Sequence, residues 1–186
     1  MYGFTVSMAA TSGKPDWKGF CDKLKTGGAV AAVSVALVMT PFSAAAISGG
    51  GKDYASKDWS GADFSKGSFV GKDFSGAIAR GTNFRGADLR GARFFKADLR
   101  EADFTGSDLR TASLEGASLK DAIFVNAVME SAYLSDSILE AGDLHNIDAS
   151  DALMPEFVTS KLCKRSDVSG TNAKTKVDTR ESLMCD

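Results

Sequence analysis

The sequence predicts an all-β solenoid followed by a short C-terminal cap. A five-residue pattern runs without insertion over 53–151: a small residue, Asp or Asn, Leu or Phe, and two polar residues. This period fits neither the 3.6-residue repeat of a helix nor the two-residue repeat of a strand. Fixed-period repeats form solenoids in which each unit buries its apolar face against its neighbours. The period stops after Asp151, and Pro155 breaks the pattern.

The repeat itself predicts the interior of the solenoid. Every fifth residue from Tyr54 to Ala149 gives 20 central positions in one frame, and most are Leu or Phe. We expect these side chains to point inward. The small residue two positions earlier, Ala in eleven of the 20 repeats, fills the space that close packing leaves beside them.

These repeats resemble the pentapeptide-repeat proteins over roughly 100 of the 186 residues. The resemblance implies a right-handed quadrilateral β-helix with one repeat on each side and therefore about five coils, roughly 24 Å long. Residues 20 positions apart then lie on the same side of consecutive coils. This arrangement predicts a core stack of Phe64, Phe84, Phe104 and Phe124.

Residues 1–46 are typical of a targeting presequence with a Sec-type signal. Lysines precede an apolar stretch of 11 residues, and Pro41 and a small-residue site ending at Ala46 follow it, which predicts cleavage after Ala46. The alternative is a retained transmembrane anchor over 27–47, which contains no charge and is just long enough to span a bilayer.

The charge of the chain limits its partners. The formal net charge is −2. Removing residues 1–46 takes away four of the 22 basic and two of the 24 acidic residues, which leaves about −4. The protein is therefore not basic enough to be expected to bind nucleic acid, and it is only mildly acidic.

Residues 152–186 are expected to cap the solenoid, because the end of a solenoid otherwise exposes its core. A short helix over 156–163 would place Phe157, Val158 and Leu162 on one side. A second helix start is predicted at Asp178, which has the spacing of a capping box with Glu181.

Two of the three cysteines, Cys163 and Cys185, lie in this cap, while Cys21 lies in the presequence. In an exported protein, two cysteines in one small segment predict a disulfide.

The tail is also similar to that of the thylakoid-lumenal pentapeptide proteins of chloroplasts. The similarity rests on Leu162-Cys163, Gly170-Thr171-Asn172 and the ending Asp178 to Cys185, with Met184 where glycine is common. It implies the chloroplast thylakoid lumen, either as a soluble protein or as one anchored by an uncleaved helix.

The sequence predicts no enzyme, cofactor or metal site. His145 is the only histidine and is expected to be solvated on the surface, so no catalytic triad can be assembled. Asp88 and Asp108 would stack one coil apart beside Arg90 and Arg110, which predicts mutual neutralisation rather than a cation site. The glycines follow the repeat and form no phosphate-binding loop.

Two surfaces are candidates for a protein partner. The first is a belt of arginines, each directly after a central residue: Arg80, Arg85, Arg90, Arg100 and Arg110. The alternative is that these arginines are simply solvated side chains on the outer wall of the solenoid. The second is an apolar belt formed by one outward residue on each of four consecutive sides, Ile123, Val128, Tyr133 and Ile138. Val125 lies beside Ile123 and extends this belt. Exposed apolar belts mark covered or partnered surfaces, so we expect the cap to cover one part and a partner the rest.

The sequence therefore predicts a non-enzymatic lumenal scaffold that docks on a photosynthetic membrane complex such as a photosystem, as an assembly factor or accessory subunit. A redox-responsive protein switched by a Cys163–Cys185 disulfide is the alternative. A DNA mimic that binds topoisomerase, as some cytosolic members of the family do, is disfavoured by the weak net charge, the arginines and the signal.

Overall fold

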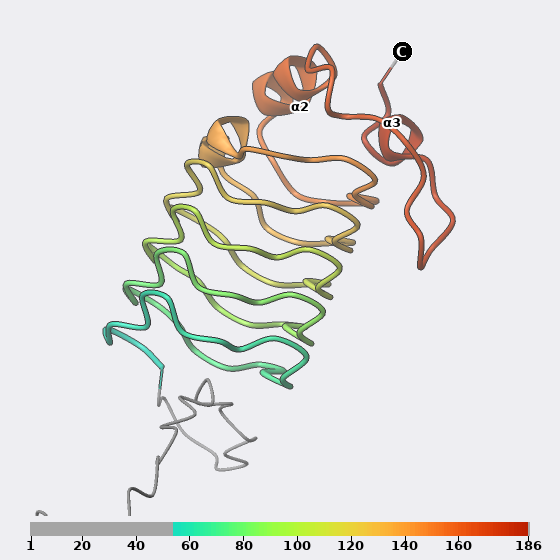
Figure 1. The fold of residues 1–186 in the computed structure, drawn as a ribbon. Helices are drawn as coiled ribbons and strands as arrows, with labels where there is room; N and C mark the ends of the chain where they lie inside the picture. Colours follow the sequence, from blue (N-terminus) through green and yellow to red (C-terminus); the bar gives the residue numbers. More distant parts are fainter. Residues whose placement is uncertain (1–53, 186) are drawn as a thin grey trace, which may run out of the picture. The chain divides into compact units, whose positions relative to one another are not determined.

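The computed structural model describes residues 54–185, which form a stack of coils closed by a cap at the C-terminal end (Figure 1). Parallel β-bridges join residues 20 positions apart, as in the column Asp63, Asn83, Asp103 and Ile123. Four such columns alternate along the chain, so each coil has four sides with one repeat on each. In each coil a side contributes a single bridge residue rather than an extended strand, and the last parallel bridge reaches Leu153.

Backbone hydrogen bonds hold each coil to the next. The Phe84 N–H donates to Asp103 O in the following coil at 2.8 Å, and the Asn83 N–H donates to Ala62 O in the preceding coil at 2.9 Å. Most corners between sides need a residue with positive φ two positions after the centre, and Asp136 and Ala141 are the exceptions among the described repeats. Gly86 meets this need at +63°, a value that glycine adopts without steric cost.

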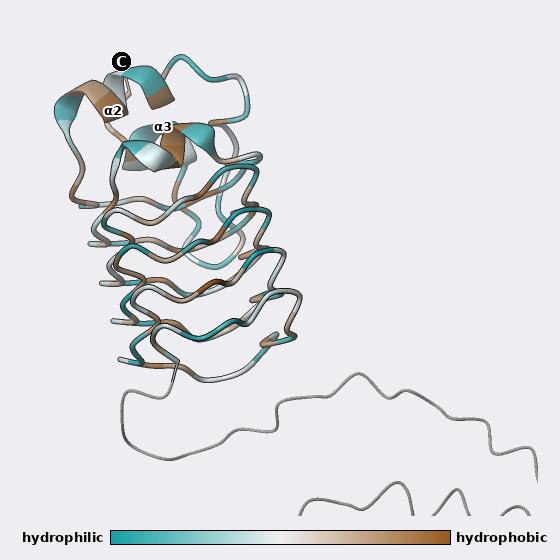
Figure 2. Ribbon diagram, turned by 90° about the vertical axis from the view of Figure 1, so that its left-hand side faces the viewer, coloured by the Kyte–Doolittle hydropathy of each residue, from teal (hydrophilic) through white to brown (hydrophobic). Residues whose placement is uncertain are grey.

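The central side chains fill the interior as predicted. Phe84, Phe104 and Phe124 are fully buried. Their ring centroids lie 5.0 Å apart from one coil to the next, with ring planes within 5° of parallel. Phe64 continues the stack at 5.5 Å from Phe84 with a tilted ring. Figure 2 shows the resulting alternation of hydrophobic and hydrophilic residues along every coil.

One repeat departs from the predicted frame. Asp136–Glu140 forms a 3₁₀-helix (η1), and no bridge joins Ser118 to Ile138. The predicted outward position of Ile138 is wrong, because this side chain is fully buried while Leu139 is only partly buried. Both residues are large and apolar, so the tighter 3₁₀ turn exchanges which of the two points inward.

Arg165 and Asp167 of the cap bind the backbone at this irregular coil. The Arg165 guanidinium donates to Leu139 O at 2.8 Å and to Ala141 O at 2.9 Å, and it pairs with the Asp167 carboxylate at 2.7 Å. Asp167 Oδ2 accepts from the Leu144 N–H. The carbonyl groups of Leu139 and Ala141 and the N–H group of Leu144 thus form hydrogen bonds with side chains of the cap.

The cap contains two short helices, α2 (Glu156–Leu162) and α3 (Thr179–Ser182). Val158 and Leu162 are buried against the core as predicted, whereas Phe157 is 52% exposed. A seven-residue helix buries one face, and Phe157 lies off that face. The predicted start at Asp178 is confirmed, because its carboxylate accepts from the N–H groups of Arg180 and Glu181.

A hairpin between the helices lies against one side of the solenoid (Figure 1). An antiparallel bridge between Thr171 and Asp178 closes it. Asn172 Nδ2 donates to Ala127 O at 3.1 Å and to Asn146 O at 2.8 Å, and Lys174 Nζ reaches Gly106 O. The hairpin thereby spans three coils through polar contacts.

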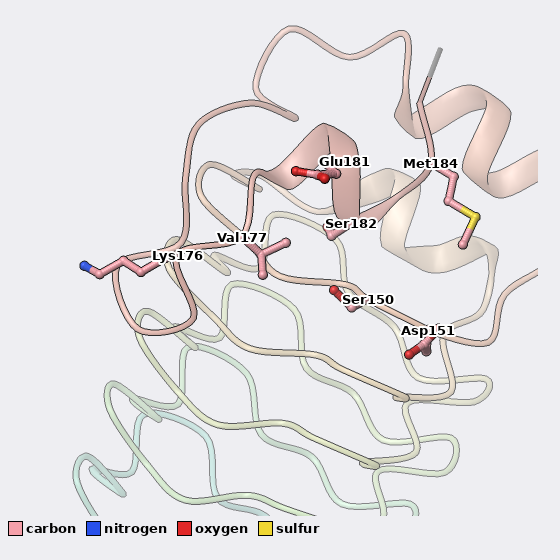
Figure 3. A pocket seen from close by; sticks show the side chains of 7 residues that line it. All are labelled: Ser150, Asp151, Lys176, Val177, Glu181, Ser182 and Met184. Atoms are coloured by element: carbon pink, nitrogen blue, oxygen red, sulfur yellow. The ribbon is translucent and has the colours of Figure 1, made fainter.

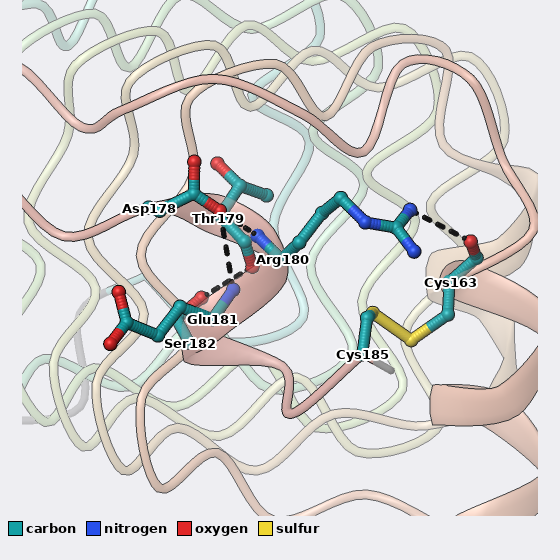
Figure 4. The surroundings of a disulfide bond; sticks show 7 residues. All are labelled: Cys163, Asp178, Thr179, Arg180, Glu181, Ser182 and Cys185. Carbon is teal, nitrogen blue, oxygen red and sulfur yellow. Dashed lines mark hydrogen bonds between the residues drawn. A yellow bond between two sulfur atoms is a disulfide. The ribbon is translucent and has the colours of Figure 1, made fainter.

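The predicted disulfide joins Cys163 at the end of α2 to Cys185 after α3, with 5.5 Å between the Cα atoms (Figure 4). Arg180 Nη1 also donates to Cys163 O at 3.0 Å. Within residues 54–185, no helix is long and apolar enough to cross a membrane. The predicted signal (1–46), the alternative anchor (27–47) and Cys21 lie outside the described residues.

Candidate functional site: an apolar groove on one side of the solenoid

The predicted apolar belt does not run around the coil. Val128 and Ile138 are buried, which corrects their assignment as surface residues. Ile123 and Val125 are half-buried, and only Tyr133 is largely exposed, at 51%. Val128 lies next to Ala127, which the hairpin contacts, and Ile138 turns inward in η1. Exposure is thus concentrated on one of the four sides.

Tyr133 forms one wall of a groove of about 680 Å³, which we call the Tyr133 groove. Leu153 follows Tyr133 in the same bridge column, and Phe157 lies in the first turn of α2; these two side chains are 53% and 52% exposed. Leu134, Met154 and Pro155 complete the apolar lining. The groove therefore forms where the last coil passes into the first helix of the cap.

Two carboxylates, those of Glu115 and Asp136, also line the groove. Glu115 lies one coil before Ser135, and Asp136 begins η1. Within the part of the chain that the structure describes, neither has a Lys or Arg nitrogen within 4.0 Å. The groove thus combines an apolar lining with two carboxylates that form no ion pair within the described residues.

The same side carries a further exposed aromatic residue, Phe95, which is 39% exposed. Lys96 Nζ lies 5.1 Å from the centroid of the Phe95 ring, and Lys161 Nζ lies 5.5 Å from that of Phe157. An ammonium over an aromatic face is attracted by the ring quadrupole. Lys96 and Lys161 therefore lie over two exposed rings of this side, whose bridge column also carries Arg93.

Sequence reasoning missed Leu153, Phe157 and Phe95 as surface residues. Leu153 lies two residues beyond the predicted end of the repeats, and Phe157 was expected to cover the core. The signal that could have found Leu153 is the 20-residue spacing, since continuing the column of Tyr133 by one coil leads to it.

The arginines of the predicted belt lie on three of the four sides and are all paired. Arg80 and Arg85 reach across one coil to Asp98 and Asp103, at 2.7 and 2.8 Å. The other three bind the aspartate two residues earlier in their own repeat: Arg90 to Asp88, Arg100 to Asp98 and Arg110 to Asp108. This arrangement is the mutual neutralisation expected for Asp88 and Asp108.

These pairs shift the titration of the carboxylates. Hydrogen bonds from Arg100, and also from Arg80, hold the pKa of Asp98 well below its usual range. The Arg90 guanidinium likewise lowers the pKa of Asp88. Because all these side chains remain partly exposed, each pair contributes little to stability by itself.

The aspartate columns bring no metal-binding cluster together: within residues 54–185, no three His, Cys, Asp or Glu side chains are placed to hold an ion. His145 has a 49% exposed side chain, and its Nδ1 lies 2.6 Å from Asp143 Oδ1.

A smaller pocket of about 380 Å³ lies between the last coil and α3, with Ser150 and Asp151 on one side and Ser182 and Met184 on the other (Figure 3).

Comparison with known proteins places this arrangement in a family. Residues 60–95, 97–136 and 112–148 match the family of pentapeptide repeats. A crystal structure of a pentapeptide repeat protein from the Arabidopsis thaliana thylakoid lumen is 35% identical with a TM-score of 0.66; the match covers 72% of this chain and 91% of that one. No curated protein matches the chain significantly.

Two other solved structures are more distant. A pentapeptide repeat protein of the cyanobacterium Cyanothece is 23% identical with a TM-score of 0.37, over 47% of this chain and 56% of that one. A plasmid-mediated fluoroquinolone resistance protein is 22% identical with a TM-score of 0.26, over 55% and 60%. The 20-residue coil, the repeat match and the lumenal relative together show that this chain belongs to the pentapeptide-repeat family, whose fold is a right-handed quadrilateral β-helix.

Proposed function

We propose that the protein is a non-enzymatic docking protein of the chloroplast thylakoid lumen, which binds a photosynthetic membrane complex through the Tyr133 groove as an assembly factor or accessory subunit. The observation that carries this proposal is the grouping of Tyr133, Leu153 and Phe157, each about half exposed, around one groove. Clustered exposed apolar side chains are typical of surfaces that a partner covers.

The lumenal location is supported by two independent features. The most extensive structural similarity reported above is to a lumenal protein of Arabidopsis, and residues 1–46 have the lysines, apolar stretch and small-residue site expected of an export signal. The disulfide in the cap is compatible with an oxidising compartment.

Native electrophoresis of gently solubilised thylakoids tests the proposal. The full precursor is expressed in chloroplasts as wild type, as the groove variant Tyr133→Ser/Leu153→Ser, and as the control Val70→Ser/Ile78→Ser, which changes two exposed apolar residues on other sides. We expect wild type and control to migrate with a membrane complex and the groove variant to run free. A wild-type protein that runs free, or a groove variant that stays bound, would contradict the proposal.

The mass of the protein in the same preparation separates the two forms of location. A chain that begins near Ile47 would be a processed lumenal protein, whereas a chain that keeps 27–47 would be anchored. The anchored form would shift the role toward a permanent subunit.

A redox-responsive role is the second candidate, because the half-exposed Cys163–Cys185 bond joins α2 to the segment that follows α3. Reduction would remove this covalent link and leave α3 held by noncovalent contacts, such as the hydrogen bond from Thr179 Oγ1 to Ile147 O, so a switch requires that these contacts open as well. A reduction potential well above about −300 mV would favour this role, while a lower one indicates a purely structural bond. A DNA-mimic role stays disfavoured, because arginines neutralise the aspartate columns of the wall.

A further inference from the structure

We propose that the Tyr133 groove selects a polypeptide segment of the partner in which apolar side chains stand next to lysine or arginine. This inference rests on the proposed docking function and specifies the chemistry of the segment that docks. It follows from the charges around the groove, their lack of internal partners, and the geometry of the side on which they lie.

The carboxylates of the solenoid wall are of two kinds, those paired with arginine and those without such a partner. On the other three sides, arginine guanidinium groups neutralise aspartates, as in the pairs Arg90–Asp88 and Arg80–Asp98. Glu115 and Asp136 in the groove have no such pair among the described residues. A partner that contributes a cation at this place gains an attraction that the protein does not already satisfy.

The apolar side chains of the groove determine which residues of the partner segment accompany the cation. Tyr133 and Leu153 are adjacent in one bridge column, and Phe157 of α2 faces the same groove. A buried apolar anchor in such a groove supplies most of the affinity, while charges at its edge supply selectivity and association rate. The complementary segment therefore places an aliphatic or aromatic side chain in the groove and a basic one beside Glu115 or Asp136.

The dimensions indicate how long the segment is. Phe95 and Pro155 occupy the same position on coils that are three bridge spacings apart, about 14 Å at 4.8 Å per coil. An α-helix covers this distance with about ten residues, and an extended chain with about four. The cations of this side lie at the two ends of this span, Arg93 and Lys96 at the coil of Phe95 and Lys161 beside Phe157, with Glu115 and Asp136 on the coils between them.

Other occupants fit the charges less well. An anionic lipid surface would bring its negative headgroups onto Glu115 and Asp136. A second copy related by a two-fold axis would bring the same pair of carboxylates against the groove of the first, because such an interface places identical patches together. A basic–apolar segment meets neither difficulty.

Direct binding of synthetic peptides tests the inference without knowledge of the partner. Three peptides of about 12 residues, long enough for either conformation, carry leucine and lysine, leucine and glutamate, or serine and lysine at the same positions. Fluorescence anisotropy with a neutral dye measures their affinity for the oxidised protein. We expect the leucine–lysine peptide to bind at least about tenfold more tightly than either of the others, with an affinity that falls as salt is raised.

Charge reversal supplies the decisive comparison. Glu115→Lys/Asp136→Lys is expected to invert the preference, so that the leucine–glutamate peptide binds more tightly. The control Glu101→Lys/Asp121→Lys changes two exposed acidic residues on another side and should leave the preference unchanged. Tyr133→Ser should abolish binding of all three peptides. Thermal unfolding verifies that each variant is folded.

Several results would overturn the inference. Equal affinity for the lysine and glutamate peptides, or a preference that survives charge reversal, would show that the groove does not select charge. Self-association abolished by Tyr133→Ser would assign the groove to a second copy, and binding to anionic vesicles through Tyr133 would assign it to lipid. If the groove variant leaves the thylakoid complex while the charge-reversed protein remains bound, the docking function stands and the inference about charge fails.

Discussion

At the scale of single residues, the interior of this solenoid depends on a few aromatic side chains that touch the next coil. Phe104 is fully buried between Phe84 and Phe124, with centroids 5.0 Å away on both sides. If the ring were removed, neighbouring side chains could not move into its place, because the hydrogen-bonded backbone of the coils holds them in position. A vacancy at this position would therefore remain largely unfilled.

We expect Phe104→Ala to lower the free energy of unfolding by about 3–5 kcal/mol, as large-to-small changes in rigid cores do. The control Phe95→Ala removes the same side chain from a 39% exposed position and should cost less than about 1 kcal/mol. Urea denaturation of both variants measures the difference. Equal losses would show that the interior relaxes around the missing ring.

Met184 has a backbone role that its sequence context did not reveal. It follows the last turn of α3 with φ of +53°. Its N–H donates to Glu181 O, and the Cys185 N–H donates to Arg180 O. These two bonds form a Schellman motif, in which glycine is the preferred residue at the left-handed position. Met184 therefore lies at a position whose backbone conformation favours glycine.

Met184→Gly is expected to stabilise the protein by about 0.5–1 kcal/mol, because relief of the left-handed strain exceeds the entropy that glycine adds to the unfolded chain. The Met184 side chain is 82% exposed, so little packing is lost. Met184→Leu keeps the strain and serves as a control without effect. A decrease in melting temperature for Met184→Gly would contradict this account.

At the scale of elements, the hairpin and the cap decide which outward residues stay exposed. The amide of Asn172 is fully buried and donates to carbonyls of two successive coils, those of Ala127 and Asn146. Its Oδ1 accepts from the N–H groups of Lys174 and Thr175. One side chain thus both shapes the hairpin and attaches it to the solenoid.

Asn172→Ala should cost about 1–3 kcal/mol, because it removes the side-chain donor to Asn146 O and the Oδ1 acceptor of the Lys174 and Thr175 N–H groups, while Ala127 O keeps the Asp148 N–H. We also expect faster trypsin cleavage after Lys174 and Lys176 in the loosened hairpin. Thr171→Ala, at an exposed neighbouring position, is the matched control. Unchanged cleavage in Asn172→Ala would mean that the disulfide alone holds the hairpin in place.

At the scale of the whole molecule, paired aspartates tie stability to pH. Arginine partners lower the pKa values of Asp88, Asp98 and Asp167 in the folded state, while the unfolded chain has values near 3.9. The unfolded state therefore takes up protons first as the pH falls. The stabilisation is complete above about pH 5 and is lost as the pH falls through the lower folded-state values.

Asp98→Asn tests this dependence, because Asp98 accepts hydrogen bonds from both Arg80 and Arg100. The variant should be less stable than wild type at pH 7, and the difference should shrink at about pH 3, where the unfolded wild-type chain has taken up the proton on Asp98 while the folded protein still holds this carboxylate ionised. The control Asp151→Asn changes an aspartate with no ion pair within the described residues. A constant difference across this pH range would show that Asp98 does not stabilise through its charge.

The sequence by itself determined the solenoid, its inward residues and the cap with its disulfide. A five-residue period states locally which side chain points inward, so the stack of Phe84, Phe104 and Phe124 could be read from spacing alone. The frame failed only at Ile138 and Leu139, where two large apolar neighbours compete for the interior and the 3₁₀ turn of η1 decides between them.

Only the tertiary structure decided which outward apolar residues form a surface. Whether Val128 is covered depends on a hairpin more than 40 residues further along the chain, and the groove at Tyr133 depends on where α2 begins after the last coil. An outward side chain is buried only where another segment, here the cap, packs over it. The five-residue repeat carries no information about that contact. The period therefore specifies the core of this protein, and long-range packing of the cap specifies its candidate binding site.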